Sequence, residues 1–299
     1  MDEQVWLTER FEEHRPRLRA VAYRMLGSLS DAEDALQEAS LRIGRADTGG
    51  VENLGAWLTT VVARVCLTML RARAARREEP LGVRMPDPVI GRGDGGDPEQ
   101  EALLADAVGL ALLVVLETLT PAERLAFVLH DMFAVPFEEI ASMLERSPAA
   151  ARQLASRARR RVRGAAPAPD PDLARQRAVV DAFFAAARDG DLDGLVAVLD
   201  PEVVLRADGG TARARRTVVI HTAGEVAAQA VTAARLAPFV RPALVNGTAG
   251  VVVVARGRVL SVMGFTVAGG RIVAIDVLQD PDRLARLDIT ALDGAPGAS

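Results

Sequence analysis

The feature that most restricts the fold of this chain is a pair of breaks in its composition, which divide it into three segments. Proline, glycine and aspartate crowd the stretch 78–99, and a second break rich in proline and alanine lies at 164–171. Both stretches lack hydrophobic periodicity, which is typical of linkers. The length of 299 residues fits two or three domains of ordinary size. The sequence therefore predicts three folded segments joined by two linkers.

The first two segments have the periodicity of helices. Their apolar residues recur at intervals of three and four positions, without the alternation of a strand. Ser30 with Glu33, and Thr120 with Glu123, have the spacing of capping boxes, and Ser147 stands before a proline, as at a helix start. Both segments are therefore predicted to be all-helical.

The third segment, beyond residue 170, changes to helices followed by strands. Helices are expected over 173–188 and 192–199, and strands over 203–206, 217–220, 250–255, 260–267 and 271–278. Gly269-Gly270 has the composition of a hairpin turn. Helices followed by a meander of antiparallel strands predict an α+β domain, so the fold class is two all-α modules followed by an α+β cone. The predicted boundaries are 1–78 and 106–165 for the helical domains, 79–105 for the linker, 171–288 for the α+β domain and 289–299 for a flexible tail.

The cations of the chain are concentrated in two clusters. The formal net charge is −4, and every cationic side chain is an arginine, because the sequence has no lysine. Arginine binds phosphates and guanine edges through its planar guanidinium, so the placement of the arginines matters more than the net charge. Seven arginines and no acidic residue lie between Arg146 and Gly164, and the second cluster consists of Arg71, Arg73, Arg76 and Arg77.

The larger cluster follows a helix-turn-helix pattern. A helix is predicted from Phe137 to Leu144, then a short turn, then a second helix from Pro148 to Arg163. One stripe of the second helix is apolar, so its other side could enter the major groove with the N-terminal half near base edges. A basic amphipathic helix that binds RNA, a membrane or an acidic partner is the alternative. The candidate base readers are Arg152, Ser156 and, more weakly, Gln153, and the candidate phosphate anchors are Arg157, Arg159, Arg160 and Arg163.

The predicted helix after Ser30 has an apolar face and an acidic face. Spacing alone favours a solvated surface over a docking surface for the acidic side. The apolar face carries Ala32, Leu36, Ala39 and Ile43, and the acidic face carries Glu33, Asp34, Gln37 and Glu38.

These segments resemble the extracytoplasmic-function sigma factors of bacterial RNA polymerase, from about residue 7 to 163. The run Asp31-Ala-Glu-Asp-Ala-Leu-Gln-Glu-Ala39 resembles the region 2 helix that docks on polymerase, and Leu54 to Arg71 resembles the helix that opens the −10 element. Leu119 to Arg163 resembles region 4, the reader of the −35 element. The resemblance implies promoter-specific transcription initiation, with core RNA polymerase and promoter DNA as partners.

The resemblance also implies residue roles. The polymerase contacts would be the β′ clamp helices and the β flap, with Asp31, Glu33, Asp34, Gln37 and Glu38 on the clamp helices. The −10 element would meet Trp57, Arg64, Arg71 and Arg73, and the −35 element would meet the second helix of the helix-turn-helix. An opened strand needs arginines on its backbone and apolar or aromatic surface against its bases. Among apolar neighbours, however, Trp57 is more typical of a core position.

The third segment resembles the SnoaL-like or NTF2-like domains, and the whole chain resembles the sigma subgroup that carries such a domain and is regulated by it in cis. Whether the cone holds a small ligand is left open by the sequence. The subgroup motifs that would make the interdomain contacts are Pro86, Asp87 and Pro88 in the linker, Asp208, Gly209 and Gly210, and Asp280 and Pro281.

Two other classes of function compete with this interpretation. A one-component regulator would bind duplex DNA without polymerase, but it leaves the acidic helix and the second basic cluster unexplained. An isomerase-like enzyme would use Asp208, His221 or Asp276, because a carboxylate in an apolar pocket can acquire a pKa suited to proton transfer. A non-enzymatic sigma factor is favoured over both.

Cysteine and histidine are too sparse to build a metal site. The single cysteine, Cys66, lies in an apolar helical run and is predicted to be buried, and His14, His130 and His221 are scattered. We therefore expect neither a metal nor a cofactor. The start of the chain is acidic and the longest apolar run, 107–116, is too short to cross a bilayer, so a cytoplasmic protein without a membrane span is expected.

Overall fold

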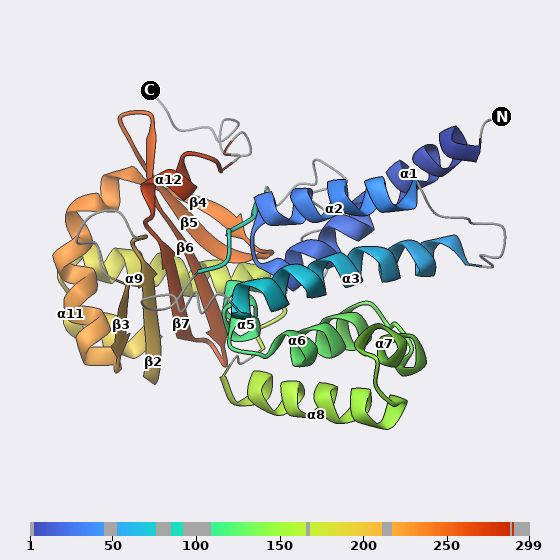
Figure 1. Ribbon diagram of the computed structural model, residues 1–299. Helices are drawn as coiled ribbons and strands as arrows, with labels where there is room; N and C mark the ends of the chain where they lie inside the picture. Colours follow the sequence, from blue (N-terminus) through green and yellow to red (C-terminus); the bar gives the residue numbers. More distant parts are fainter. Residues whose placement is uncertain are drawn as a thin grey trace. The chain divides into compact units, whose positions relative to one another are not determined.

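The computed structural model describes residues 3–44, 53–75, 85–91, 109–165, 168–210, 217–287 and 289, which form two compact units (Figure 1). The first unit holds the described residues 3–44, 53–75 and 115–165. The second unit holds 85–91, 109–114, 168–210, 217–287 and 289, so the described part of the predicted linker belongs with the C-terminal domain. The predicted tail apart from Ile289, and Arg76 and Arg77 of the smaller basic cluster, lie outside the described residues. The exact domain boundaries stay predictions.

The first unit is built from helices. After the linker stretch, the chain returns to this unit in α5 (Gly109–Glu117), whose last three residues belong to it. Its other elements are α1 (Glu3–Leu26), α2 (Leu29–Ile43), α3 (Leu54–Ala75), α6 (Pro121–Phe127), the π-helix η1 (Val128–Met132), α7 (Phe137–Leu144) and α8 (Pro148–Ala165).

Side chains at the helix starts satisfy backbone amides that have no partner inside the helix. Thr120 and Glu123 form the predicted capping box of α6, and the Ser147 hydroxyl accepts the amide of Ala150 at the start of α8. The predicted box of Ser30 and Glu33 is wrong. Helix α2 starts one residue earlier than Ser30, with Ser28 as its N-cap, and Glu33 is instead bound by arginines of α1.

The helical core of the first unit buries the apolar faces that the sequence predicted. Ala32, Leu36, Ala39 and Ile43 of α2 are all buried. Cys66 is also buried and free of any disulfide, and its burial raises the pKa of the thiol to about 12. Helix α3 is long and apolar enough to cross a membrane by length and composition, but eight of its side chains lie in this core. A buried core helix passes the same test, so α3 is no sign of a membrane span.

The second unit is a seven-stranded sheet with helices, in the order β1-β4-β5-β6-β7-β2-β3. Neighbouring strands are antiparallel except β2 and β7, which are parallel. The α+β class is therefore confirmed, but the prediction of a purely antiparallel meander is wrong. The strands are β1 (Ile90–Gly91), β2 (Leu199–Asp208), β3 (Val218–His221), β4 (Val240–Val245), β5 (Thr248–Ala255), β6 (Arg258–Ala268) and β7 (Arg271–Leu278).

The sequence analysis missed several elements of this unit, including two strands and a helix. Strand β4 contains an arginine and a proline and is largely exposed in its first half, so it lacks an alternating apolar pattern. Strand β1 is only two residues long and exists because it pairs with β4, Ile90 opposite Val245. Helix α11 (Ala223–Ala233) is rich in alanine and separates β3 from β4. It provides part of the long connection that the sheet order requires.

The two faces of the sheet have different covers. On one face pack α9 (Leu173–Asp189), α10 (Leu192–Val198) and α11, around a core that includes Phe183, Val251 and Phe265 (Figure 1). On the other face lie Met85 and Ile90 of the linker stretch and Leu110 of α5. Gly264 of β6 leaves room there, because an added Cβ would lie 3.3 Å from Leu110. The linker stretch is thus part of the core of this unit.

Candidate functional site

The helix-turn-helix consists of α7, a tight turn and α8. Glu145 takes the left-handed conformation, with φ of 55°, and ends α7 so that the chain can turn into α8. Ala151, Leu154, Ala155 and Ala158 of α8 are buried against the unit. The opposite face is basic, with Ser156 and Arg159 half-buried and with exposed Arg152, Gln153, Arg157, Arg160 and Arg163.

The arginines of α8 fall into two groups by their partners. Arg159 is bound to Asp131 of η1 at 2.6 Å, and Arg161 to Glu123 of α6 at 3.0 Å. These two arginines fasten α8 to the rest of its module. Arg157, Arg160 and Arg163 make no ion pair among the described residues, so their charges remain available for phosphates.

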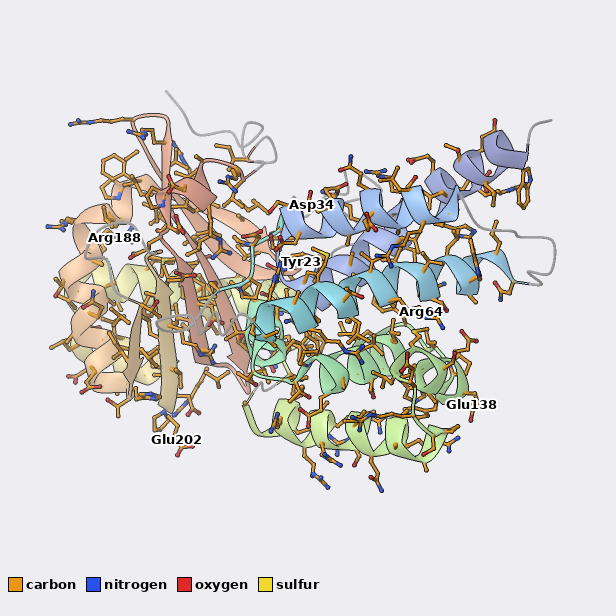
Figure 2. All side chains as sticks on the ribbon, in the orientation of Figure 1. Tyr23, Asp34, Arg64, Glu138, Arg188 and Glu202 are labelled. Atoms are coloured by element: carbon orange, nitrogen blue, oxygen red, sulfur yellow. The ribbon has the colours of Figure 1, made fainter. Side chains whose placement is uncertain are left out.

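Arg152 stands at the N-terminal end of the basic face, over α7. Its guanidinium lies 2.9 Å from Glu138 and 5.4 Å from the centroid of the Phe137 ring. Both charged side chains are more than half exposed, so this ion pair is worth little and can be exchanged for another partner. Figure 2 shows Glu138 at the surface of α7.

The acidic residues of α2 also divide into two groups. Asp31 is bound by Arg73 of α3, and Glu33 by Arg15 at 2.8 Å and Arg19 at 2.6 Å of α1. These two carboxylates hold the three-helix module together. The outward face consists of Asp34, Gln37 and Glu38, followed one turn later by Leu41, which is 57% exposed (Figure 2).

The four candidate residues for the −10 element do not share one environment. Trp57, for which the sequence favoured a core position, is only half-buried, while Arg64 and Arg71 are exposed. Arg73 donates to the Leu26 carbonyl at 3.3 Å in addition to its ion pair with Asp31. Arg73 therefore serves the packing of α3 on its own module.

The two helical modules pack on each other within the first unit, and two buried arginines lie at the contact. Arg24 of α1 is 1% exposed and Arg124 of α6 is 2% exposed. Arg124 donates to the Arg24 carbonyl at 3.2 Å and to Glu117 at 2.8 Å. The Arg24 guanidinium lies 5.3 Å from the centroid of the Phe133 ring. Sequence analysis missed both arginines, because on spacing alone they cannot be told from surface residues.

In the second unit, charged residues hold the linker stretch to the sheet. Asp208, at the end of β2, accepts the amide of Met85 at 2.9 Å and a guanidinium N–H of Arg283 at 3.0 Å. Arg283 lies in α12 (Pro281–Leu284) and also donates to the Asp87 carboxylate at 2.9 Å and to the Met85 carbonyl at 2.6 Å. We call Met85, Asp87, Asp208 and Arg283 the linker clamp.

The motif residues predicted for interdomain regulation surround this clamp. Asp280 caps α12, and Gly210, with φ of 75°, lies so close that an added Cβ would be 2.5 Å from the Asp280 carboxylate. Pro86 and Pro88 are buried beside Asp87. The sequence analysis missed Arg283, although it follows the selected Pro281 by only two residues.

The polar residues proposed for an enzyme do not converge. Leu205 and Ala207 of β2 and Val277 of β7 line a cavity on the helix-covered face of the sheet. Successive side chains of a strand point to opposite faces. Asp208, next to Ala207, and Asp276, next to Val277, therefore point to the other face. Asp276 is bound to Arg206 at 2.6 Å, and its burial raises the pKa of the carboxyl although Arg206 opposes the shift. His221 is exposed at the end of β3. These groups therefore form no acid–base pair at the cavity.

The arrangement offers no ready metal site in the part of the chain that the structure describes. No group of three or more histidine, cysteine, aspartate or glutamate side chains lies close enough there to hold a metal ion.

Comparison with known proteins assigns both helical modules to known models. Residues 10–76 match the model of Sigma-70 region 2, and residues 109–162 match that of Sigma-70 region 4. The ECF RNA polymerase sigma factor SigJ of Mycobacterium tuberculosis is 49% identical over 201 residues, 66% of this chain and 64% of SigJ. The probable ECF RNA polymerase sigma factor SigI of the same species is 35% identical over 277 residues, 91% of this chain and 92% of SigI.

A solved structure extends the match to the C-terminal unit. The crystal structure of the M. tuberculosis extracytoplasmic function sigma factor SigJ superimposes with a TM-score of 0.76 and 36% identity, and covers 95% of this chain and 100% of that one. The chain belongs to the family of extracytoplasmic-function RNA polymerase sigma factors.

Proposed function

We propose that this protein directs core RNA polymerase to specific promoters and that its C-terminal domain regulates it in cis. Helix α2 would dock on the β′ clamp helices through Asp34, Gln37 and Glu38, and the region 4 module would meet the β flap. Helix α3 would bind the opened −10 element through Trp57, Arg64 and Arg71, and α8 would read the −35 element.

The observation that carries the proposal is the basic face of α8 behind a helix-turn-helix turn. The exposed residues at its N-terminal half, Arg152 and Gln153, are placed to reach base edges in a major groove. Arg157, Arg160 and Arg163 continue the same face with uncommitted charges, as phosphate binding requires. Of the arginine and aspartate residues first considered, Arg159, Arg73 and Asp31 act as internal supports of these surfaces.

Regulation in cis is supported by the linker clamp. Residues 85–91 connect the two helical modules in the chain, and they are bound to the C-terminal sheet by the clamp and by strand β1. A linker held in this way restricts how far the modules can separate. Release of the clamp would lengthen the free linker and change the reach from the −10 to the −35 element.

We propose a cytoplasmic, non-enzymatic role, because polymerase and promoter are cytoplasmic in bacteria and no acid–base pair of described residues lies at the cavity of the C-terminal domain. The family membership supports both points. A one-component regulator would need no acidic docking face, and the exposed Asp34, Gln37 and Glu38 would then be without a purpose.

Run-off transcription with bacterial core polymerase on the promoter upstream of the chain's own gene tests the proposal. We expect a promoter-specific transcript that requires the chain and falls at least tenfold in Glu38→Arg, because the reversed charge opposes docking. The control is Glu13→Arg on α1, since Glu13 is also an exposed partner of a helical ion pair. An equal loss in both variants, or no loss in Glu38→Arg, would refute the docking face.

A further inference from the structure

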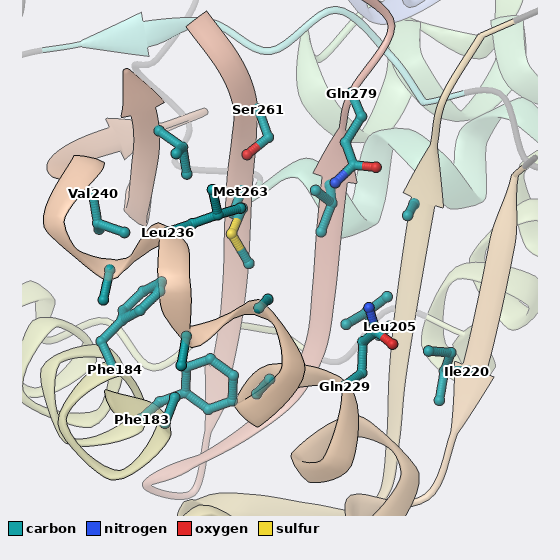
Figure 3. Close-up of a pocket in the computed structure, with 18 of the residues that line it drawn as sticks. Phe183, Phe184, Leu205, Ile220, Gln229, Leu236, Val240, Ser261, Met263 and Gln279 are labelled. Carbon is teal, nitrogen blue, oxygen red and sulfur yellow. The ribbon is translucent and has the colours of Figure 1, made fainter. Parts of the chain in front are cut away.

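The helix-covered face of the C-terminal sheet encloses a cavity of about 250 Å³ (Figure 3). Its wall is mainly apolar and comes from α9, α11, the 3-10 helix η2 (Ala234–Phe239) and six strands of the sheet, β2 to β7. Phe183 and Phe184 lie on one side of the cavity, and Ser261 and Gln279 lie on another. The two matching family models, over residues 10–76 and 109–162, include none of these residues.

The polar groups of this cavity are neutral. They are Gln229, Ser261 and Gln279, and none of the described residues that line the cavity is charged. Ser261 is only 4% exposed and Gln279 is half-buried, and no hydrogen bond between described residues includes the Ser261 hydroxyl or the side-chain amide of Gln279. Both side chains line the cavity, so a bound molecule can serve as their hydrogen-bond partner. A charged ligand would lose its hydration there without gaining a counter-charge.

We propose that the cavity binds an uncharged, mainly apolar small molecule with a hydrogen-bonding group, and that its binding stabilises the linker clamp. The size sets the scale of the ligand. An apolar protein cavity of about 150 Å³ holds benzene, so this one has room for a fused two-ring compound with a polar substituent. The ligand's polar group would meet Ser261 and Gln279, and its apolar body would meet the two phenylalanines.

The coupling to the clamp follows from chain connectivity. Gln279 lines the cavity, and its backbone amide donates to the Asp208 carbonyl at 2.7 Å. The next residue, Asp280, caps the helix that carries Arg283. On β2 the order is the same, because Ala207 lines the cavity and Asp208 holds Met85. The chain thus passes from the cavity to the clamp in one residue at the end of β2, and in four residues after β7, from Gln279 to Arg283.

A ligand that needs Gln279 in place will therefore oppose any opening that displaces the end of β7. At a free ligand concentration ten times Kd, an opening that destroys the site becomes about tenfold rarer. This regulatory step rests on the proposed control of the sigma factor by its C-terminal domain, whereas binding itself does not. The clamp would then respond to a metabolite-sized signal through the sheet.

Equilibrium dialysis of the full chain against 2-naphthol and 2-naphthoate tests the ligand class, since the two probes share a ring system and differ in charge. We expect one bound 2-naphthol per chain, held at least tenfold more tightly than 2-naphthoate. Ala230→Phe fills the cavity and should weaken 2-naphthol binding at least tenfold, while Ala228→Phe, at an exposed position of the same helix, should not. Ser261→Ala provides a gentler variant with a several-fold loss.

Absence of 2-naphthol binding, equal binding of the two probes, or binding that survives both Ala230→Phe and Ser261→Ala would overturn the ligand proposal. Hydrogen exchange then tests the coupling. Saturation with 2-naphthol should slow exchange of the Met85 and Ile90 amides about tenfold, and unchanged or faster exchange would overturn it. Neither measurement uses polymerase or promoter, so failure here is distinct from failure of the run-off assay.

Discussion

Three exposed arginines of α8 and Arg283 of the linker clamp are the same side chain in two opposite settings. Arg157, Arg160 and Arg163 are exposed and have no ion pair among the described residues, whereas Arg283 is 18% exposed and binds two carboxylates and a carbonyl. An exposed guanidinium is available to a partner and contributes little to folding. A sequestered one holds the chain to itself, and its loss leaves buried carboxylates without a counter-charge. Burial therefore separates arginines that can bind a partner from arginines that hold the chain together.

The largest effect that would test this comparison is expected at Arg283. Arg283→Ala removes the guanidinium that binds Asp87 and Asp208, 16% and 9% exposed, and should destabilise the second unit by about 3 kcal/mol. Urea unfolding measures this loss of stability, and hydrogen exchange of the Met85 amide measures the loss at the clamp itself. Arg286→Ala, an exposed arginine three residues on, is the control. If both variants unfold at the same urea concentration, the clamp does not contribute to the stability of the second unit. The promoter activity of Arg283→Ala should also differ from that of the wild type.

The next effect is expected on recognition and not on folding. Arg152→Ala should weaken binding of the polymerase complex to its promoter by about 2 kcal/mol and relax the preference at one base pair of the −35 element. Stability should change little, because the Arg152 pair with Glu138 is exposed. Binding to a panel of −35 sequences measures both features, with Arg188→Ala on α9 as the control. A uniform loss over all sequences would make Arg152 a phosphate contact.

A smaller effect separates two neighbours on α8. Arg160→Ala should reduce the salt dependence of promoter binding by about one phosphate contact and leave stability within about 0.5 kcal/mol. Arg161→Ala should lower stability and leave the salt dependence unchanged, because Arg161 is bound to Glu123, which is 6% exposed. Binding titrations at several salt concentrations, paired with thermal unfolding of both variants, measure this. Equal salt slopes for the two variants would count against the division of α8 by its partners.

The smallest effect concerns pH. Burial raises the folded-state pKa of Asp276 above its ordinary value of 3.8, with Arg206 opposing the shift. The folded state then binds the proton more readily than the unfolded state, so the stability due to this group falls as pH rises from about 3.8 through the raised pKa. Asp276→Asn should remove this fall. The unfolding free energy of the wild type minus that of the variant, measured by urea from about pH 4 to 7, should fall with rising pH. A constant difference would contradict the shift.

The sequence predicted the local features well because they are local. Thr120 with Glu123, the Ser147 start of α8 and the hairpin at Gly269 and Gly270 each depend on a few adjacent residues. Elements that exist through distant partners escaped, as β1 did, because two residues carry no pattern without β4 beside them. The parallel pairing of β2 with β7 has no signal in either strand alone.

The candidate site shows the same division. Motif and charge selected α2, α3 and α8, yet they could not separate Asp34 from Asp31 or Arg160 from Arg159. That separation depends on the partners Arg73 and Asp131, which lie 42 and 28 residues away in the sequence. Arg24, Arg124 and Arg283 were missed for the same reason, because their roles depend on burial.

The central claim is that the exposed charges of this chain serve promoter recognition together with polymerase. Fluorescence anisotropy of a labelled promoter duplex, with the chain alone, with core polymerase alone and with both, tests it most directly. The account predicts sequence-specific binding only when both are present, and its loss with Glu38→Arg. Equally tight and specific binding by the chain alone, unaffected by Glu38→Arg, would contradict the account and indicate a regulator that acts on duplex DNA by itself.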